Sequence, residues 1–181
     1  MSEPTEPESL RNLLRGEKVR LSAMHHADLA TVARWYEDDT FLRLYDALPA
    51  HPKTEAELTT WLEAARKADN HVLFAVRLLG GDELVGFVEF DGILWTHGVS
   101  GVGACIGDVT ERGPAYGREA LSLALDFAFD ELNLHHVVAT VFPYNAGSMA
   151  LVENLGFKRE GNLRQHIHRN GRRYDMFLYG L

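Results

Sequence analysis

The segment TERGPAYGREAL, residues 110–121, joins a loop with two glycines and a proline to a run of helix-forming residues. The first turn of a helix carries unpaired backbone N–H groups and the positive end of the helix dipole, so it attracts anions. Gly113 and Gly117 let a ligand approach the backbone closely, and Arg112 and Arg118 add positive charge. The same residues also suit an ordinary helix start with solvated arginines, so the segment alone leaves both interpretations open.

Two familiar nucleotide-binding motifs do not fit this region. A P-loop has the form GxxxxGKS or GxxxxGKT, but the residue five positions after Gly113 is Arg118, and no Lys-Ser or Lys-Thr pair follows. Residues 101–107, GVGACIG, have one residue too many for the dinucleotide fingerprint GxGxxG and lie within an expected strand. The N–H donors expected for a phosphate at this loop are Gly113, Ala115, Tyr116, Gly117 and Arg118.

The segments on both sides of the loop have strand and helix patterns. Strand patterns occupy residues 17–23, 71–79, 83–93, 99–109, 135–142 and two stretches of 157–181. Helix patterns, with apolar residues gathered on one face, occupy residues 26–39, 54–68, 116–132 and 146–157. This order predicts a mixed α/β (α+β) fold with a mainly antiparallel sheet and at least one crossover connection.

Local signals define several element boundaries. Thr54 followed by Glu57 is a capping box, which marks the start of a helix. The stretch GGD at residues 80–82 and the pair NG at residues 170–171 favour tight turns between antiparallel strands. Gly156 suits the left-handed position that ends a helix.

Length and composition favour one globular domain. The chain has 181 residues, 46% of them hydrophobic and 24% charged, which is enough to bury a core. The first residues, MSEPTEPES, are acidic and contain proline, so we expect a flexible tail over residues 1–14 and a single domain over residues 15–181. The longest purely apolar run, residues 72–76, is far too short to span a membrane.

Charge and cysteine content narrow the class of partner. The formal net charge of −8 argues against nucleic-acid binding, which depends on basic surface. The single cysteine, Cys105, excludes an internal disulfide and leaves a Cys-x-x-Cys metal site without its ligands. We therefore expect a cytoplasmic protein that binds neither nucleic acid nor membranes and holds no metal.

Three motifs, in order along the chain, carry a family resemblance. Residues 112–117, RGPAYG, match the pattern Q/R-x-x-G-x-G/A, with Ala115 in place of the usual first glycine. Residues 145–148, NAGS, match N-x-x-S, and the Gly-Phe pair at residues 156–157 follows. Over about residues 15–181 the chain resembles the GNAT superfamily of acetyl-CoA-dependent N-acetyltransferases, in particular the ribosomal-protein (RimJ/RimL) type.

The resemblance implies a GNAT fold, in which a twisted, mixed and mainly antiparallel sheet is flanked by helices on both faces. It also implies that acetyl-CoA is the co-substrate, that an amine attacks it directly in a ternary complex, and that the loop binds the coenzyme A pyrophosphate. The thioester is then expected beside the strand that precedes the loop, where backbone N–H groups stabilise an oxyanion. The coenzyme-binding residues implied in this way are Cys105, Ile106, Gly107, Arg112, Gly113, Ala115, Tyr116, Gly117, Arg118, Asn145 and Ser148.

Proton transfer needs an acid for the leaving thiol and a base for the amine. Many GNAT enzymes carry a tyrosine acid about five residues before the phenylalanine of the Gly-Phe pair, but Val152 occupies that position. The resemblance then points to Ser148 as the acid, with an ordinary helix-surface hydroxyl as the alternative. Glu89 is the expected base, because it interrupts an apolar strand and a two-residue period places it on one face with Val85, Phe87 and Asp91. A solvated outward position is the alternative for Glu89, and Asp108 is the second candidate base.

The acceptor class follows from the cost of neutralising an amine. A lysine amine with a pKa of about 10.4 costs about 4–5 kcal/mol to neutralise at pH 7, whereas an α-amine with a pKa of about 7.8 costs about 1 kcal/mol. A weak base therefore favours the α-amine of a protein or peptide, in agreement with the ribosomal-type resemblance. Small amines such as polyamines and aminoglycosides stay open as acceptors.

Two other classes of function stay open at this point. A GNAT-fold protein can bind an acyl-CoA as a sensor without turnover, and this alternative is favoured by the absence of the tyrosine acid. The other alternative is a nucleotide-binding module without acyl transfer, which only the glycine-containing loop supports. Whether the chain forms a homodimer is also left open.

Overall fold

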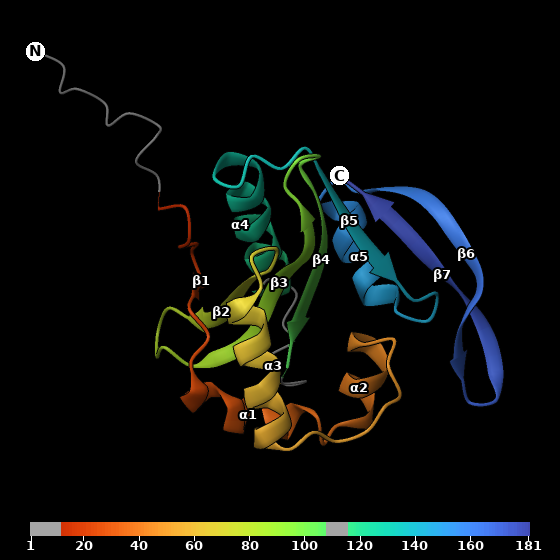
Figure 1. Ribbon diagram of the computed structural model, residues 1–181, viewed down its shortest axis with the longest axis horizontal. Helices are drawn as coiled ribbons and strands as arrows, with labels where there is room; N and C mark the ends of the chain where they lie inside the picture. Colours follow the sequence, from red (N-terminus) through yellow and green to blue (C-terminus); the bar gives the residue numbers. More distant parts are fainter. Residues whose placement is uncertain (1–11, 108–115) are drawn as a thin grey trace, which may run out of the picture.

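The computed structural model describes residues 12–107 and 116–181 (Figure 1). In this part of the chain one seven-stranded sheet has the order β1-β2-β3-β4-β5-β7-β6. The strands are β1 (Val19–Ser22), β2 (Val72–Leu78), β3 (Leu84–Leu94), β4 (Val99–Ile106), β5 (His136–Val141), β6 (Lys158–Arg169) and β7 (Arg172–Gly180). The helices are the 3₁₀ helix η2 (His26–Asp28), α1 (Leu29–Trp35), α2 (Asp39–Tyr45), α3 (Glu55–Lys67), α4 (Tyr116–Asp130) and α5 (Ala146–Asn154).

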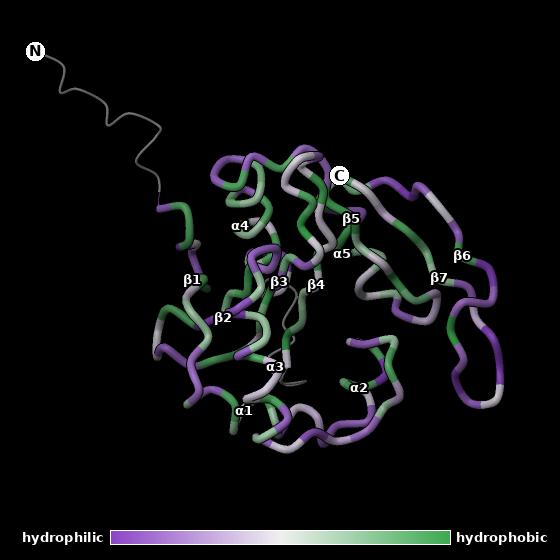
Figure 2. The backbone as a smooth tube through the Cα atoms, in the orientation of Figure 1, coloured by the Kyte–Doolittle hydropathy of each residue, from purple (hydrophilic) through white to green (hydrophobic). Residues whose placement is uncertain are grey.

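The mixed, mainly antiparallel sheet is confirmed. Strands β4 and β5 pair in parallel through the α4 crossover, and the other neighbouring strands in the described part of the chain pair antiparallel. The expected turn at residues 170–171 joins β6 to β7, and both of its residues have positive φ angles, 50° and 72°. The hairpin of β6 and β7 forms one edge of the sheet, and its tip is hydrophilic (Figure 2).

Helices cover both faces of the sheet, as expected (Figure 1). One apolar core joins the sheet to α4 and α5, with Ala124 of α4 and Val152 of α5 buried in it. A second core joins the opposite face to α1, α2 and α3, with Val32, Phe41 and Leu62 at its centre. None of the helices in the described ranges has the length and apolar character needed to cross a membrane.

The expected single helix over residues 26–39 is wrong, because the structure divides this region differently. Helix α1 ends at Trp35, and a separate helix, α2, begins at Asp39. Asp38 adopts an extended conformation between them, and its side chain accepts a hydrogen bond from the Thr40 N–H at 2.8 Å. An aspartate in this position stops one helix and caps the next, and the periodicity of apolar residues does not report that break.

The expected face of Val85 is also wrong. Gly86 pairs with Val76 and Leu84 pairs with Arg77, so Val85 is an extra residue in β3. Such a bulge interrupts the two-residue alternation of side chains. Val85 consequently lies in the core beneath α4, whereas Phe87 packs on the opposite face with α1, α2 and α3.

The carboxylate of Glu119 joins the start of α4 to the segment that leads into β1. It accepts hydrogen bonds from three successive backbone N–H groups, those of Glu17, Lys18 and Val19, the last two at 3.1 Å. Gly16 permits this contact, because a Cβ atom there would lie 2.2 Å from a carboxylate oxygen of Glu119. The contact holds the first turn of α4 against β1.

We predict that Glu119→Gln lowers the free energy of unfolding by about 1–2 kcal/mol, since hydrogen bonds to a charged acceptor contribute more than those to a neutral one. Urea unfolding followed by circular dichroism measures the change. Asp130→Asn is the matched control, because Asp130 is exposed in the last turn of the same helix, where a negative charge opposes the helix dipole. Equal stability of Glu119→Gln and the wild type would contradict the anchoring role.

Candidate active site

The sheet opens between β4 and β5. Their parallel pairing covers three residue pairs and ends at Gly101 and Val138, although β4 continues to Ile106 and β5 to Val141. Beyond the last pair, β4 still pairs with β3, so its edge toward β5 is turned to the gap. Backbone groups along such an edge can bind an extended ligand much as a neighbouring strand would.

A cavity of about 480 Å³ occupies this opening. Phe41 and Tyr45 of α2 line it from one face of the sheet, and Gly117 and Ala120 of α4 line it from the other. Ile106 of β4 lies between the two groups. The cavity therefore passes through the sheet and joins the N-terminal end of α4 to the surface of α2.

The start of α4 supplies the positively charged end of the cavity. Gly117 and Arg118 line the cavity, and the Arg118 side chain is exposed. Tyr116 is half-buried and packs against the core beneath α4, outside the described cavity lining. The other loop residues expected here, Arg112, Gly113 and Ala115, and the second candidate base, Asp108, lie outside the described residues.

The end of β4 contributes unequally to the cavity. Cys105 and Ile106 line it, as does Ala104, which the sequence reading did not select. The Gly107 N–H donates to the Val85 carbonyl at 2.9 Å, so it points toward β3 and away from the opening. By strand alternation, the backbone groups of Ala104 point toward the gap. Gly107 has a packing role as well, because a Cβ atom there would lie 1.9 Å from the Trp35 ring.

Asn145 connects the two sides of the cavity. It is buried, and its Oδ1 atom accepts the Ser148 N–H at 3.0 Å, which caps α5. Its Nδ2 atom donates to the Leu44 carbonyl of α2 at 3.3 Å. Ser148 is half-buried and lines the same cavity, whereas Val152 is directed into the core beneath the sheet.

Glu89 is held by two side chains that sequence reasoning missed. The Tyr45 hydroxyl donates to Glu89 Oε1 at 2.8 Å, and Nε2 of His71 lies 3.0 Å from Oε2. The Glu89 and His71 side chains are 16% and 15% exposed, so the pair is largely shielded from water. Of the three, only Tyr45 is among the described residues that line the cavity.

This environment shifts two pKa values. The hydrogen bond to Glu89 raises the pKa of His71 above its ordinary value of 6.5, and nearby Asp91 contributes to the shift. Burial, followed by the charge of Glu89, raises the pKa of Tyr45 well above 10.0, so Tyr45 stays a neutral hydrogen-bond donor. No pattern in the sequence reveals the cluster, because its members come from α2, β3 and the turn before β2.

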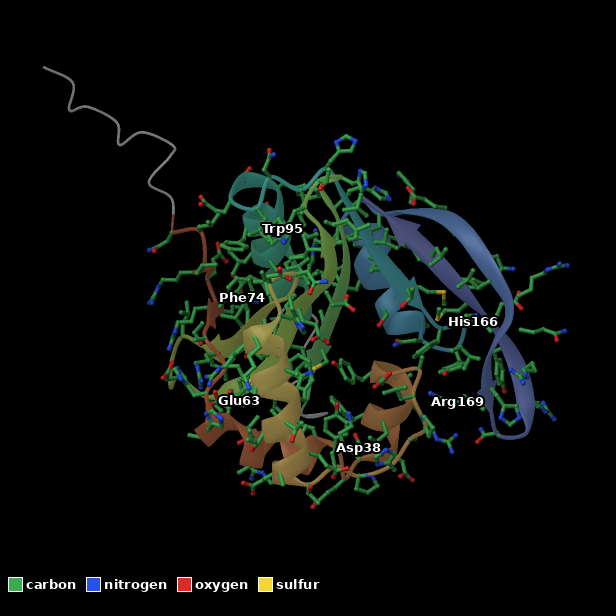
Figure 3. The ribbon with its side chains drawn as sticks, viewed as in Figure 1. Asp38, Glu63, Phe74, Trp95, His166 and Arg169 are labelled. Atoms are coloured by element: carbon green, nitrogen blue, oxygen red, sulfur yellow. The ribbon has the colours of Figure 1, made fainter. Side chains whose placement is uncertain are left out.

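A second groove of about 340 Å³ adjoins the cavity and shares Leu44 and Tyr144 with it. It lies between α2 and the tip of the β6–β7 hairpin. Arg169 extends from the hairpin toward α2 (Figure 3), and its Nη2 atom donates to the carbonyls of residues 46 and 48. Arg43 of α2 donates to the Asn170 side chain at 2.7 Å, which completes the connection. Asp39, Arg43 and Arg169 are the charged residues of the groove within the described ranges.

Comparison with known proteins gives a consistent family match. The model of the acetyltransferase (GNAT) domain matches residues 18–158. The uncharacterized N-acetyltransferase YokL, derived from the SPbeta prophage of Bacillus subtilis, is 30% identical over 92% of this chain and 90% of its own length. Spermidine N(1)-acetyltransferase of Vibrio cholerae is 27% identical over 93% of this chain and 88% of its own length.

A solved structure supports the fold. RimJ of Mycobacterium smegmatis in complex with CoA-disulfide superposes with a TM-score of 0.79, covering 90% of this chain and 81% of that chain. The sequences are 22% identical.

The His71–Glu89 pair predicts a defined pH dependence of stability. A histidine with a raised pKa in the folded state stabilises the protein fully below the unfolded pKa of about 6.5. This contribution declines as the pH rises above that value and is lost once the pH passes the pKa of the folded state. The difference in the free energy of unfolding between the wild type and His71→Gln should therefore be largest at about pH 5.5 and decrease toward about pH 9.

Urea unfolding at a series of pH values measures this difference. His97→Gln is the control, because His97 is exposed in the turn between β3 and β4. A difference between the wild type and His71→Gln that stays constant across the series would contradict the prediction.

Proposed function

The chain belongs to the acetyltransferase (GNAT) family and is an acyltransferase enzyme, and we propose that it transfers the acetyl group of acetyl-CoA to the α-amine of a peptide. The observation that carries this proposal is the cavity that passes through the sheet between β4 and β5. It offers a coenzyme entry at α4 and an acceptor entry at α2. Such an arrangement lets the amine reach the thioester directly, without a covalent acyl-enzyme.

The residues of the cavity suit acetyl-CoA. The N-terminal end of α4 and the Arg118 guanidinium are the donors that a pyrophosphate requires. The backbone edge of β4 at Ala104 can hydrogen-bond the amide groups of the pantetheine arm, with Asn145 on the opposite side. When bound, acetyl-CoA supplies the activated acetyl carbonyl. The loop at residues 112–115 completes the expected coenzyme site in this proposal.

Two groups are assigned to proton transfer in the proposed reaction. Glu89 is the base, in a position shielded by Tyr45 and His71. Ser148 is the acid for the leaving thiol, since it lines the cavity and its backbone N–H already donates to Asn145 Oδ1. This leaves the Ser148 hydroxyl as the group that can serve a ligand.

Electrostatics of the acceptor side support a peptide over a polyamine. Among the described residues, the cavity lining has one formal charge, that of Arg118. The adjoining groove has two arginines, Arg43 and Arg169, and one aspartate, Asp39. A polyamine carries several ammonium groups and needs carboxylates around them, whereas the excess of positive charge that the two arginines give the groove favours the carboxylate of a peptide. The resemblance of the sequence motifs to the RimJ/RimL type favours the same choice.

A polyamine acceptor is the second candidate. It is favoured by the 27% identity to a spermidine acetyltransferase over most of both chains. Transfer to a polyamine would need the same base and the same coenzyme site, so the two candidates differ only in the acceptor groove.

A thiol-release assay with acetyl-CoA tests the proposal. Short peptides with a free α-amine should give a kcat/KM about tenfold or more above that of spermidine or an aminoglycoside, because like charges in the groove disfavour a polycation. Arg43→Glu should lower the ratio of kcat/KM for the peptide to kcat/KM for spermidine, and Arg43→Gln should lower this ratio less. A higher kcat/KM for spermidine than for the peptides in the wild type would contradict the peptide acceptor and favour the polyamine acceptor. Binding of acetyl-CoA without thiol release above background for any acceptor would identify a non-catalytic acyl-CoA sensor.

The acid assignment predicts the effect of Ser148→Ala. This variant should lower kcat by about 10- to 10³-fold while the affinity for acetyl-CoA stays nearly unchanged. Ser122→Ala is the matched control, because Ser122 lies in α4 outside the described cavity lining. An unchanged kcat for Ser148→Ala would remove Ser148 from the mechanism.

A further inference from the structure

The proposed base does not line the cavity. Glu89 lies behind Tyr45, and the cavity wall in this region is formed by Tyr45. A carboxylate so placed needs an intermediary before it can accept a proton from an amine in the cavity. The hydrogen bond of 2.8 Å from the Tyr45 hydroxyl to Glu89 Oε1 provides one.

The orientation of the Tyr45 hydroxyl suits this task. Its proton is directed to Glu89, so the lone pairs of its oxygen stay available to accept a hydrogen bond. The ring is held on several sides, stacked on Phe41 at 5.4 Å and edge-on to Phe87 at 5.3 Å between ring centroids. Packing thus fixes the direction of the hydroxyl.

On the far side, Glu89 is held by the imidazole of His71, whose pKa this contact raises above its ordinary value of 6.5. His71 Nε2 lies 3.0 Å from Oε2, so the two carboxylate oxygens have different partners. A carboxylate with both oxygens engaged has one orientation, and an imidazole beside it changes charge in the physiological range. Tyr45, Glu89 and His71 therefore form one hydrogen-bonded unit, which we term the Tyr45–Glu89–His71 unit.

We propose that Tyr45 passes the proton of the acceptor amine to Glu89, and that His71 is a positioning residue that orients Glu89 and whose charge affects this proton transfer. This inference rests on the proposed function. It assigns to the acceptor side a catalytic residue, Tyr45, that would contact the amine itself.

The proton transfer balances without another reactant. The acceptor ammonium gives one proton to the Tyr45 oxygen as the Tyr45 hydroxyl proton moves to Glu89 Oε1. The N–H bond of the ammonium and the O–H bond of Tyr45 break, and two O–H bonds form. The products are a neutral amine with a free electron pair, an unchanged tyrosine and a neutral Glu89.

The charge of His71 decides how readily Glu89 accepts that proton. An imidazolium beside the carboxylate stabilises its negative charge, which opposes transfer of a proton to the carboxylate. A neutral imidazole retains the Nε2–H hydrogen bond to Glu89 without that opposing charge. Turnover should therefore rise as the pH rises through the pKa of His71, which the contact with Glu89 has raised.

Other titratable groups surround the unit and belong to the same pH response. The charge of Asp91 in β3 helps to raise the pKa of His71, and Cys105 of β4 helps to raise the pKa of Tyr45. Tyr36, at the end of α1, also acts on Tyr45, and its own pKa is raised mainly by burial. Asp46 after α2 acts on Tyr36, and the Lys53 ammonium lies over the Tyr36 ring at 4.8 Å. Hydrogen bonds join the three residues of the unit to one another.

Tyr45→Phe tests the relay. It keeps the ring that packs on Phe41 and removes only the hydroxyl, so the fold should be retained. With acetyl-CoA and a short peptide bearing a free α-amine, kcat should fall by about 10²- to 10⁴-fold at pH 7 while the affinity for acetyl-CoA is nearly unchanged. A kcat within about twofold of the wild type would overturn the role of Tyr45.

His71→Gln tests the positioning role through the pH profile of kcat with the same peptide. Glutamine can still donate a hydrogen bond to Glu89 but does not titrate, so the acid limb assigned to His71 should be absent from the profile of this variant. His97→Gln should retain the wild-type profile and controls for general effects of losing a histidine. An acid limb that is identical in His71→Gln and the wild type would overturn the role of His71.

Two further results separate the failure of this inference from other failures. If the wild type releases no thiol with the peptide or with spermidine, the proposed function fails and the inference fails with it. If the wild type is active and both variants behave like it, only the inference fails. If His71→Gln does not fold, an NMR titration of His71 in the wild type and in Glu89→Gln replaces this test. His71 should titrate at a lower pH in Glu89→Gln, because the contact with Glu89 raises its pKa. An unchanged titration would overturn the interaction between His71 and Glu89.

Discussion

The divergence of β4 and β5 is the constraint on which the rest of the site depends. Two parallel strands that pair over three residues and then separate leave an opening in the middle of the sheet. Strand β4 keeps its place because β3 pairs with it along its whole length, and β5 keeps its place because β7 pairs with it on the other side. A through-sheet cavity can therefore exist in a stable domain, since the unpaired backbone edge costs little where a ligand can hydrogen-bond it.

Side-chain contacts of α2 hold the cavity in shape on the acceptor side. Asn145 bonds to the Leu44 carbonyl, Arg43 bonds to Asn170, and Arg169 bonds to the two carbonyls that follow α2. These contacts join α2 to the start of α5 and to the β6–β7 hairpin, which are distant from it in the chain. A short helix gains little stability from its own hydrogen bonds, so its position is set by such tertiary contacts.

The placement of Glu89 illustrates how a charge is kept inside a protein. A largely buried carboxylate is costly unless it is paired and hydrogen-bonded, and Glu89 has partners at both oxygens. The partners that make its burial tolerable are also the groups that would govern its chemistry. The structural roles of Tyr45 and His71, the proposed catalytic role of Tyr45 and the proposed positioning role of His71 all depend on the same two hydrogen bonds. Measurements of proton transfer separate the structural roles from the proposed ones.

The sequence by itself determined the order of the strands and of helices α1, α3, α4 and α5, the capping box at Thr54, the turn at residues 170–171 and the family, because these depend on local chemistry and on the order of motifs. Sequence also predicted that Cys105, Gly117, Arg118, Asn145 and Ser148 belong to one site, and the structure brings them to one cavity. The tertiary structure alone decided the bulge at Val85, the separate helix α2 and the neighbours of Glu89. Register and contacts between distant segments decide these features, and no local pattern of residues encodes such contacts.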